Sequence, residues 1–240
     1  MQKTLLFLLF RLVLSAKLLK LCKVAISLLG NIFLEIEHMY NTEKSSLVYK
    51  SQWMQVYEDL VIYNNNNDKN NNIISSSHSI KIFNRIKVDD TVIIIPIFED
   101  GSLLMVEGYR HGAGENLLEL PGGFIEENEE PSQAAKRELF EETKHSCDSL
   151  KLINWFYTWP GRTSQKNYVF VARGLKNNND LLLGYDNNND IQFDDEEEER
   201  DIKIHKLSRG QITAELKNGR RIKSSPTLSA LFLVKEVQMI

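Results

Sequence analysis

Stretches of apolar residues alternate along the chain with polar, asparagine-rich runs. The stretches rich in β-branched and aromatic residues predict strands. These predicted strands are 52–62, 79–85, 91–97, 102–110, 117–120, 150–157, 166–172 and 201–206. Every position from Val92 to Ile95 is apolar, which is typical of a strand buried on both faces in the centre of a sheet. Asp100-Gly101 predicts a tight hairpin turn between the third and fourth of these strands.

Helix-forming patterns occur at three places in the second half of the chain. Pro131 predicts the first turn of a helix with its glutamates facing outward. The residues on the buried side of this helix are expected to be Ala134, Ala135 and Leu139. Further helices are predicted over 209–217, ending before Gly219, and from 225 to about 237. This order of elements predicts an α/β fold, in which helices cover a mixed sheet.

Four asparagine runs interrupt the pattern, at 64–67, 70–72, 177–179 and 187–189. Such polar tracts bury too little apolar surface to offset the entropy cost of ordering them, so they are predicted to be flexible surface loops. Lengthening a surface loop is inexpensive, at roughly 0.6 kcal/mol per doubling. The runs are therefore interpreted as insertions within one domain, which is expected to cover residues 37–240.

The amino-terminal segment, residues 1–36, differs from the rest of the chain in charge. Residues 1–34 contain five basic and no acidic residues, whereas the whole chain has a net charge of −4. Their uncharged apolar runs are shorter than the ~18 residues that span a bilayer. The segment is predicted to be a targeting or membrane-surface segment, with peripheral membrane contact through residues 1–34. The alternatives are a helix packed on the body of the protein and a poorly ordered tail.

Composition narrows the expected partners and compartment. The net charge of −4 gives no reason to expect a nucleic-acid partner. The two cysteines, Cys22 and Cys147, form neither a disulfide framework nor a zinc-site spacing. We therefore expect an intracellular protein, cytoplasmic or mitochondrial, with membrane association open because of residues 1–34.

The most informative chemistry is a set of glutamates on the helix that Pro131 begins. Glu138, Glu141 and Glu142 project to one side of a helix, with neighbouring Cβ atoms about 5–6 Å apart. Like charges at this spacing destabilise a bare helix, whereas a hard divalent cation is bound through such carboxylates together with substrate phosphate. The pattern predicts a metal site for phosphate chemistry.

These residues belong to a longer pattern that resembles the signature of Nudix hydrolases, G-x5-E-x7-R-E-U-x-E-E-x-G-U, where U is aliphatic. The positions in register are Gly123, Glu129, Arg137, Glu138, Leu139, Glu141 and Glu142. The resemblance implies an α/β/α sandwich with a mixed sheet and a metal-binding loop–helix–loop. The residues that it assigns to the metal, Mg²⁺ or alternatively Mn²⁺, are Gly122, Glu138, Glu141 and Glu142. It also implies that Arg137 and Glu129 pair to orient the helix and the loop.

The region before the signature is similar to that of ADP-ribose pyrophosphatases and related nucleotide-sugar hydrolases. The resemblance implies that Arg110 contacts phosphate, and that Glu119 either lies at the edge of the metal site or balances charge. Trp53 is the best placed aromatic residue for stacking on a base, by its family position. Three other aromatic residues are available for this role, namely Phe124, Trp155 and Trp159.

The chain also departs from the family pattern. Lys144 and His145 replace the final glycine and aliphatic residue of the signature. Lysine in the left-handed conformation costs roughly 1–2 kcal/mol unless the turn is rebuilt, and His145 is expected at the surface. The loop 159–165 lacks a carboxylate, so the general base stays open between Glu141, Glu142 and the acidic run 194–199.

The sequence thus predicts a Mg²⁺-dependent Nudix pyrophosphatase that hydrolyses ADP-ribose or a related nucleoside diphosphate sugar to a nucleoside monophosphate and a sugar phosphate. One alternative is a dinucleotide or coenzyme substrate. Another is a catalytically silent Nudix-fold binding module, tethered to a membrane by residues 1–34. A homodimer is expected by resemblance to dimeric ADP-ribose hydrolases.

Overall fold

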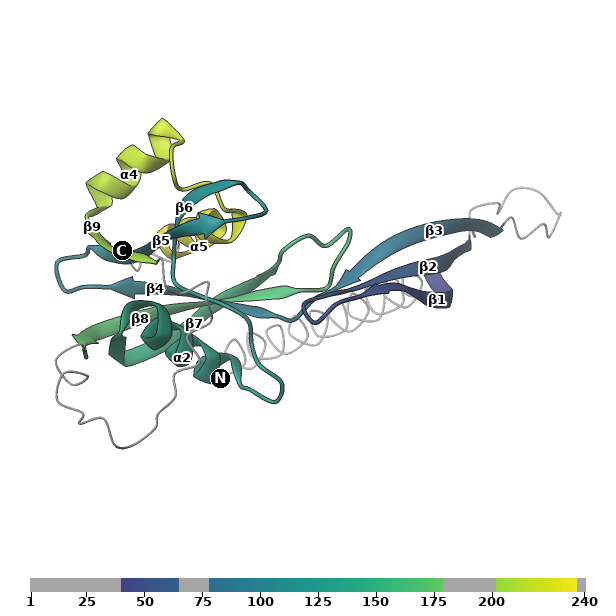
Figure 1. Cartoon of the computed structure of the whole chain (residues 1–240), viewed down its shortest axis with the longest axis horizontal. Helices are drawn as coiled ribbons and strands as arrows, with labels where there is room; N and C mark the ends of the chain where they lie inside the picture. Colours follow the sequence, from purple (N-terminus) through teal and green to yellow (C-terminus); the bar gives the residue numbers. More distant parts are fainter. Residues whose placement is uncertain (1–39, 65–77, 179–201, 237–240) are drawn as a thin grey trace, which may run out of the picture. The chain divides into compact units, whose positions relative to one another are not determined.

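The computed structural model describes residues 40–64, 78–178 and 202–236 (Figure 1). The amino-terminal segment 1–36, the acidic run 194–199 and most of the asparagine runs lie outside these described residues. The chain divides into two compact units. The described part of the first unit comprises residues 40–50, 55–64 and 78–85, and the second comprises Ser51–Met54 and the described residues from Ile86 onward.

The first unit is a three-stranded sheet with the order β1-β2-β3. Its strands are β1 (Tyr40–Lys50), β2 (Gln55–Asn64) and β3 (His78–Lys87, most of which belongs to this unit). β1 pairs antiparallel with β2 from Tyr40↔Tyr63 to Lys50↔Gln55. The sequence pattern did not predict β1, because most of its residues are polar and its backbone pairing with β2 decides its conformation.

The buried polar centre of this sheet is Asp59 on β2. Arg85 Nε donates to Asp59 Oδ2 at 2.7 Å, and the hydroxyl of Ser45 donates to the same carboxylate. These hydrogen bonds, first that of Arg85, hold the pKa of Asp59 below its usual value. The sheet also exposes several large apolar side chains, namely Tyr40, Leu47, Val48, Tyr49, Ile80, Ile82 and Phe83.

The second unit contains a six-stranded mixed sheet with the order β6-β5-β4-β8-β7, in which β9 also pairs with β5. The strands are β4 (Thr91–Ile97), β5 (Leu103–Arg110), β6 (Glu115–Glu119), β7 (His145–Tyr157), β8 (Lys166–Asn177) and β9 (Lys203–Leu207). β4 runs parallel to β8, whereas the other pairs are antiparallel. β4 is thus the predicted central strand, and it is followed by the expected turn at Gly101, whose φ is +77°.

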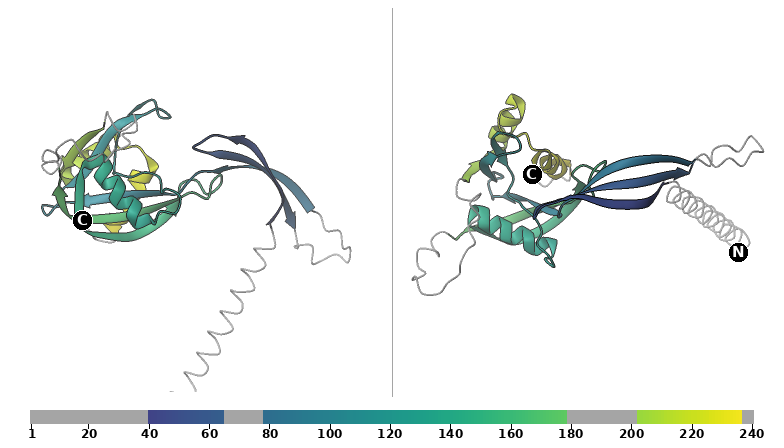
Figure 2. Two further views of the ribbon diagram at one scale, coloured as in Figure 1. Left: turned by 60° about the horizontal axis from the view of Figure 1, so that its bottom comes forward. Right: turned by 45° about the vertical axis from the view of Figure 1, so that its right-hand side comes forward.

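Helices cover both faces of this sheet, as Figures 1 and 2 show. α2 (Pro131–Thr143) packs Ala134, Ala135 and Leu139 against the face of β4 that carries Val92 and Ile94. α5 (Ser225–Glu236) packs against the opposite face of β4, in a cluster whose members from β4 and α5 are Ile93, Ile95, Ile97, Ala230, Leu231 and Val234. α4 (Arg209–Asn218) ends at Gly219, whose φ is +58°. The predicted α/β/α sandwich is therefore confirmed.

Several predicted boundaries shift in the structure: β2 begins at Gln55 instead of residue 52, β6 begins at Glu115 instead of residue 117, and the largest shifts are at β7 and β8. β7 begins at His145 instead of residue 150, and β8 continues to Asn177 instead of ending at residue 172. The added residues of β7 are mostly polar, so hydrophobic periodicity gives no strand signal there. Pairing of His145 with Asn177 extends both strands together. The hydrogen-bonding partner, and not the local sequence, decides these ends.

Candidate active site

The loop between β6 and α2 lies along β4 as an additional extended segment. Val92 N–H donates to the carbonyl of Gly123 at 2.9 Å, and Ile94 N–H donates to that of Pro121 at 2.8 Å. A backbone bond from Ile125 to Asp90 at 2.9 Å continues the pairing. These bonds fix the loop against the buried central strand, so its carbonyls and amides are rigidly placed beside α2.

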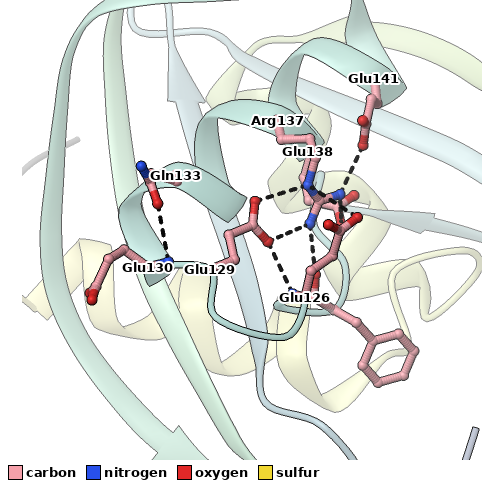
Figure 3. Close-up of polar contacts among 8 residues, drawn as sticks. Glu126, Glu129, Glu130, Gln133, Arg137, Glu138 and Glu141 are labelled. Atoms are coloured by element: carbon pink, nitrogen blue, oxygen red, sulfur yellow. Dashed lines mark hydrogen bonds and ion pairs between the residues drawn. The ribbon is translucent and has the colours of Figure 1, made fainter. Parts of the chain in front are cut away.

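The start of α2 is also well defined. Pro131 occupies the first turn, where its missing N–H leaves no intrahelical bond unmade. The backbone N–H of Glu130 donates to the side chain of Gln133 at 3.2 Å, as Figure 3 shows. The helix therefore begins at the predicted residue, and the spacing of its glutamates relative to the loop follows from that start.

Arg137 is the centre of a carboxylate cluster in this loop and helix (Figure 3). Its Nε and Nη2 donate to both oxygens of Glu129 at 3.0 and 2.9 Å, and Nη1 donates to Glu138 and Glu141, each at 2.9 Å. Nη2 also donates to the carbonyl of Phe124 at 2.9 Å. One planar guanidinium thus joins the loop to the helix, as the predicted pairing of Arg137 with Glu129 requires.

The charges of this cluster are coupled. The side-chain bond from Arg137 is the main cause that lowers the pKa of Glu129, and the backbone N–H of Glu126 also lowers it. The same bond with Glu129 is the main cause that raises the pKa of Arg137. The single guanidinium faces three bonded carboxylates, those of Glu129, Glu138 and Glu141. The cluster therefore carries more negative than positive charge.

Glu142, the remaining carboxylate of the signature, points back to the turn before the helix. Its Oε2 accepts a hydrogen bond from the backbone N–H of Gly122 at 2.9 Å. A Cβ on Gly122 would lie 2.1 Å from the carbonyl oxygen of Val92. Only glycine allows the turn to approach β4 this closely, and this approach brings its backbone beside Glu142.

Glu138 differs from the sequence prediction that the helix leaves its glutamates outward. The residue is only 8% exposed, because the loop covers it. A Cβ on Gly123 would lie 2.3 Å from Oε1 and 2.6 Å from Oε2 of Glu138. The absence of a side chain at Gly123 therefore makes the space that the Glu138 carboxylate occupies. Gly123 has no positive φ, so the need for glycine at this position comes from the close approach of Glu138 and not from backbone conformation.

The donor chemistry of this cluster fits a divalent cation. Carboxylates of one helix face and a nearby backbone are the oxygen ligands that Mg²⁺ and Mn²⁺ take. The excess negative charge, with Glu138 nearly buried, is a charge state that a bound cation would stabilise. Within the described residues, no three Asp, Glu, His or Cys side chains converge as a coordination shell. Glu138 and Glu141 share Nη1 of Arg137.

A cavity of about 190 Å³ opens beside the turn. Its lining residues are Thr91, Val92, Ile93, Arg110, Glu119, Leu120, Gly122, Gly123, Thr158, Gln165, Asn167, Pro226 and Thr227. Arg110 Nε donates to Glu119 Oε2 at 2.6 Å, so the structure brings these two predicted substrate-site residues together at the cavity wall. Glu119 thus compensates part of the charge of Arg110 at this wall.

The aromatic candidates are not gathered at this cavity. Trp53 is 59% exposed in the segment Ser51–Met54 and does not line the cavity. Phe124, Trp155 and Trp159 are also largely exposed and outside its lining. Sequence reasoning missed five uncharged polar residues that do line it, namely Thr91, Thr158, Gln165, Asn167 and Thr227. Asn167 is 3% exposed within an apolar strand, and a polar residue in such a pattern was the only available signal.

The two departures from the signature have different outcomes. Lys144 keeps the left-handed conformation of the missing glycine, with φ 54° and ψ 26°, and its N–H donates to the carbonyl of Phe140 at 2.7 Å. His145 is 8% exposed, so the expectation of a surface histidine is wrong. Its Nδ1 lies 2.6 Å from the carbonyl oxygen of Thr143, and its ring meets Phe98 edge-on. It is a packed residue at the start of strand β7.

Comparison with curated proteins finds relatives over part of the chain. The methanol dehydrogenase activator of Bacillus methanolicus is 36% identical over 84 residues, 35% of this chain and 45% of that protein. The ADP-ribose pyrophosphatase of Bacillus subtilis is 34% identical over 90 residues, 38% of this chain and 49% of that protein. The ADP-sugar pyrophosphatase of Mus musculus is 41% identical over 90 residues, 36% of this chain and 41% of that protein. The matches thus span less than half the length of each relative.

Two further comparisons cover more of the chain. A crystal structure of an ADP compounds hydrolase shares the fold with a TM-score of 0.64 at 20% identity, over 83% of this chain and 94% of that one. The family model described as NUDIX domain matches residues 87–222. That range exceeds half of the chain and contains α2, the turn at Gly122 and the carboxylate cluster around Arg137. The chain belongs to the Nudix family.

Proposed function

We propose that this protein is a Mg²⁺-dependent Nudix pyrophosphatase that hydrolyses the diphosphate bond of ADP-ribose or a related nucleoside diphosphate sugar. The products are a nucleoside monophosphate and a sugar phosphate. The observation that carries the proposal is the intact cluster of Arg137 with the signature carboxylates, beside a cavity that contains Arg110. The names of two relatives, an ADP-ribose and an ADP-sugar pyrophosphatase, support the substrate class.

The residues of this chain have separable tasks in such a reaction. Arg110 at the cavity wall binds phosphate oxygens, for which its planar fork is suited. Glu119 orients Arg110 through their 2.6 Å ion pair. Arg137 is a positioning residue, because it fixes Glu129 in the loop and Glu138 and Glu141 on the helix at the same time. The buried strand β4 holds the loop in place. The attacking group and the phosphorus atom of the substrate would therefore be held in a fixed relative position.

Glu138, Glu141, Glu142 and the carbonyl of Gly122 would hold the cation. When bound, it supplies a Lewis acid that polarises phosphoryl oxygens and lowers the pKa of water. The proton of the attacking water requires a base. Within the described residues the loop Trp159–Gln165 contributes no carboxylate, which favours Glu141 or Glu142 for this task. Glu142 stands beside the turn and has one carboxylate oxygen bonded to Gly122 N–H.

The direct test is AMP release from ADP-ribose by the full-length protein with Mg²⁺, and with EDTA as the metal-free control. Glu142→Gln is the decisive variant, because a glutamine oxygen still accepts from Gly122 N–H while the charge is lost. The matched control is Glu127→Gln, which removes the same charge from an exposed position of the loop that precedes α2. We expect loss of turnover only for Glu142→Gln. Undiminished hydrolysis by this variant would refute the metal assignment.

The same assay separates the alternatives. A dinucleotide or coenzyme that is hydrolysed in preference to ADP-ribose would keep the chemistry and change the substrate. The lack of a carboxylate in Trp159–Gln165 favours the second alternative, a silent binding module. Such a module would release no product from any nucleoside diphosphate derivative, although nucleotide binding by calorimetry would persist.

We also propose that the protein is a homodimer that associates through the first unit. The support is the set of exposed apolar residues of β1 and β3, including Leu47, Val48 and Ile82. A three-stranded sheet with apolar residues exposed to this extent commonly marks an interaction surface. Ile82 is 64% exposed, so Ile82→Glu costs little in a monomer and should separate a dimer in light scattering. A monomeric wild-type protein would contradict this proposal.

The segment 1–34 is proposed to target the protein within the cell or to contact an anionic membrane surface. Its support is the five basic residues without any acidic one. Within residues 40–64, 78–178 and 202–236, no helix is long and apolar enough to cross a membrane. Co-sedimentation of the full-length chain with anionic and with neutral vesicles tests the surface contact, since attraction by basic residues predicts binding only to the anionic ones.

A further inference from the structure

One wall of the cavity consists of uncharged polar side chains that form a continuous chain of hydrogen bonds. The hydroxyl of Thr91 on β4 donates to Asn167 Oδ1 at 2.8 Å, and Asn167 Nδ2 donates to Thr158 Oγ1 at 2.6 Å. The hydroxyl of Thr158 then donates to Gln165 Oε1 at 2.8 Å. Gln165 Nε2 ends the chain by donating to the carbonyl of Asp89 at 2.7 Å. The chain therefore connects Thr91 on β4 and Asn167 on β8 with Thr158 and Gln165, which lie in the loop between β7 and β8.

This network is ordered from its buried end. Asn167 is 3% exposed, and a buried amide is held in one orientation by the bonds that satisfy it. Thr158 is exposed and Gln165 is half-buried, so these two residues present the network to the cavity. Asn167 is thus a positioning residue, and Thr158 and Gln165 are the groups that a ligand can reach.

The exposed end of the network offers both kinds of hydrogen-bonding group without a charge. A threonine hydroxyl has two acceptor lone pairs, and a glutamine side chain has two N–H donors and two acceptor lone pairs. The bonds within the chain use only part of this capacity at Thr158 and Gln165. A sugar hydroxyl both donates and accepts, so it matches such a wall, whereas a buried ionic group would find no counter-charge there.

The rest of the cavity differs in charge. Arg110 and Glu119 line it as an ion pair at 2.6 Å, which suits the phosphate portion of a ligand. The cavity therefore has a charged portion and a neutral portion. A nucleoside diphosphate sugar has the same division between its diphosphate and its hydroxyl-bearing sugar.

We propose that Thr158 and Gln165, held in place by Asn167, form the subsite that binds the hydroxyl groups of the non-nucleotide half of the substrate. This inference rests on the proposed function, because it assigns a part of the same cavity. These uncharged side chains would then determine which group beyond the diphosphate the site accepts. Removing one of its bonds to substrate weakens binding of the sugar and leaves the diphosphate chemistry intact.

The test compares two substrates that share ADP: ADP-ribose and an alkyl ester of ADP whose alkyl group has no hydroxyl. The full-length protein carries Thr158→Val, which removes the hydroxyl at constant shape, or Gln165→Met, which removes the amide at similar length. Loss of one hydrogen bond predicts a KM for ADP-ribose about fivefold higher, with kcat unchanged. The kcat/KM for the alkyl ester stays at the wild-type value in both variants.

Two control variants isolate the hydroxyl. Thr158→Ser keeps it and should restore the wild-type KM. Thr213→Val makes the same substitution on α4, where the described structure shows the hydroxyl donating only to the carbonyl of Arg209. This variant should keep the wild-type KM and kcat for both substrates. Equal losses for both substrates in Thr158→Val would show that the network merely supports the loop. That result, or an unchanged KM for ADP-ribose, would overturn the subsite.

A binding measurement keeps this test independent of turnover. Wild-type protein that hydrolyses neither substrate would refute the proposed function, and not the subsite. Calorimetric titration with ribose 5-phosphate then tests the subsite directly. Ribose 5-phosphate should bind the Thr158→Ser variant about fivefold more tightly than the Thr158→Val variant. Equal affinities of these two variants, or no binding to the wild type, would overturn the inference.

Discussion

Replacing each of the two adjacent glycines in the turn before α2 by alanine is predicted to have different effects, on stability for Gly122 and on activity for Gly123. At Gly122 the new Cβ would lie 2.1 Å from the carbonyl oxygen of Val92, a backbone atom of the central strand. At Gly123 it would lie 2.3 Å from Oε1 of Glu138, the end of a side chain. Backbone of a buried strand cannot retreat without disturbing the core, whereas a carboxylate can turn away.

The magnitudes follow from what must move. Gly122→Ala forces a backbone displacement in the packed sheet, which should cost about 3 kcal/mol, the upper part of the range for overpacking. For a chain of this size that corresponds to roughly 6–12 °C in Tm. Gly123→Ala should cost at most about 1 kcal/mol, but it moves the Glu138 carboxylate by about 1 Å to reach van der Waals separation. A displacement of that size at a catalytic group costs about 100-fold in rate, or roughly 2.7 kcal/mol in barrier.

The assay measures Tm by circular dichroism and kcat/KM for ADP-ribose in saturating Mg²⁺, for both variants and the wild type. We expect Gly122→Ala to lower Tm mainly. Gly123→Ala should mainly lower kcat/KM, while its Tm stays within a few degrees of the wild type. Gly108→Ala is the matched control, since its Cβ would meet only Ile202 at an ordinary 3.8 Å. Wild-type activity of Gly123→Ala would refute the placement of Glu138 at the reacting centre.

Three further predictions concern other parts of the molecule. Arg137→Lys should lower kcat/KM about 10–100-fold, because lysine cannot reproduce the planar fork that holds Glu129, Glu138 and Glu141 together; full activity would contradict the positioning role. The Asp59 carboxylate has a pKa below 3.8 in the folded state, so its contribution to stability is present above that pH and is lost as the pH falls through the folded value. The Tm difference between wild type and Asp59→Asn should therefore be constant from pH 7 to about pH 5 and shrink below about pH 4, and a constant difference throughout would contradict it. Deleting residues 1–34 should change vesicle binding or cell fractionation without changing activity, whereas loss of folding would favour the packed helix.

Local pattern alone was enough to locate the elements that contain the site. The apolar run of β4 fixed a buried central strand with the bounds Thr91–Ile97, and Pro131 fixed the start of α2. Once the helix start is known, a period of 3.6 residues places Glu138, Glu141 and Glu142 on one side. These features depend on neighbours close in sequence, which is why they can be predicted without the fold.

The tertiary structure decided what surrounds those elements. Burial of Glu138 follows from the loop pairing with β4, and burial of His145 follows from the extension of β7 along β8. The hydrogen-bond network of the cavity wall joins Thr91 to Thr158 and Gln165 through Asn167. Thr91 lies more than sixty positions before the other three residues in the sequence. β1 is likewise a strand only because β2 supplies its hydrogen-bonding partners. Contacts between distant segments leave no local periodicity, so only the folded chain shows which polar residues line the cavity beside the turn at Gly122 and Gly123.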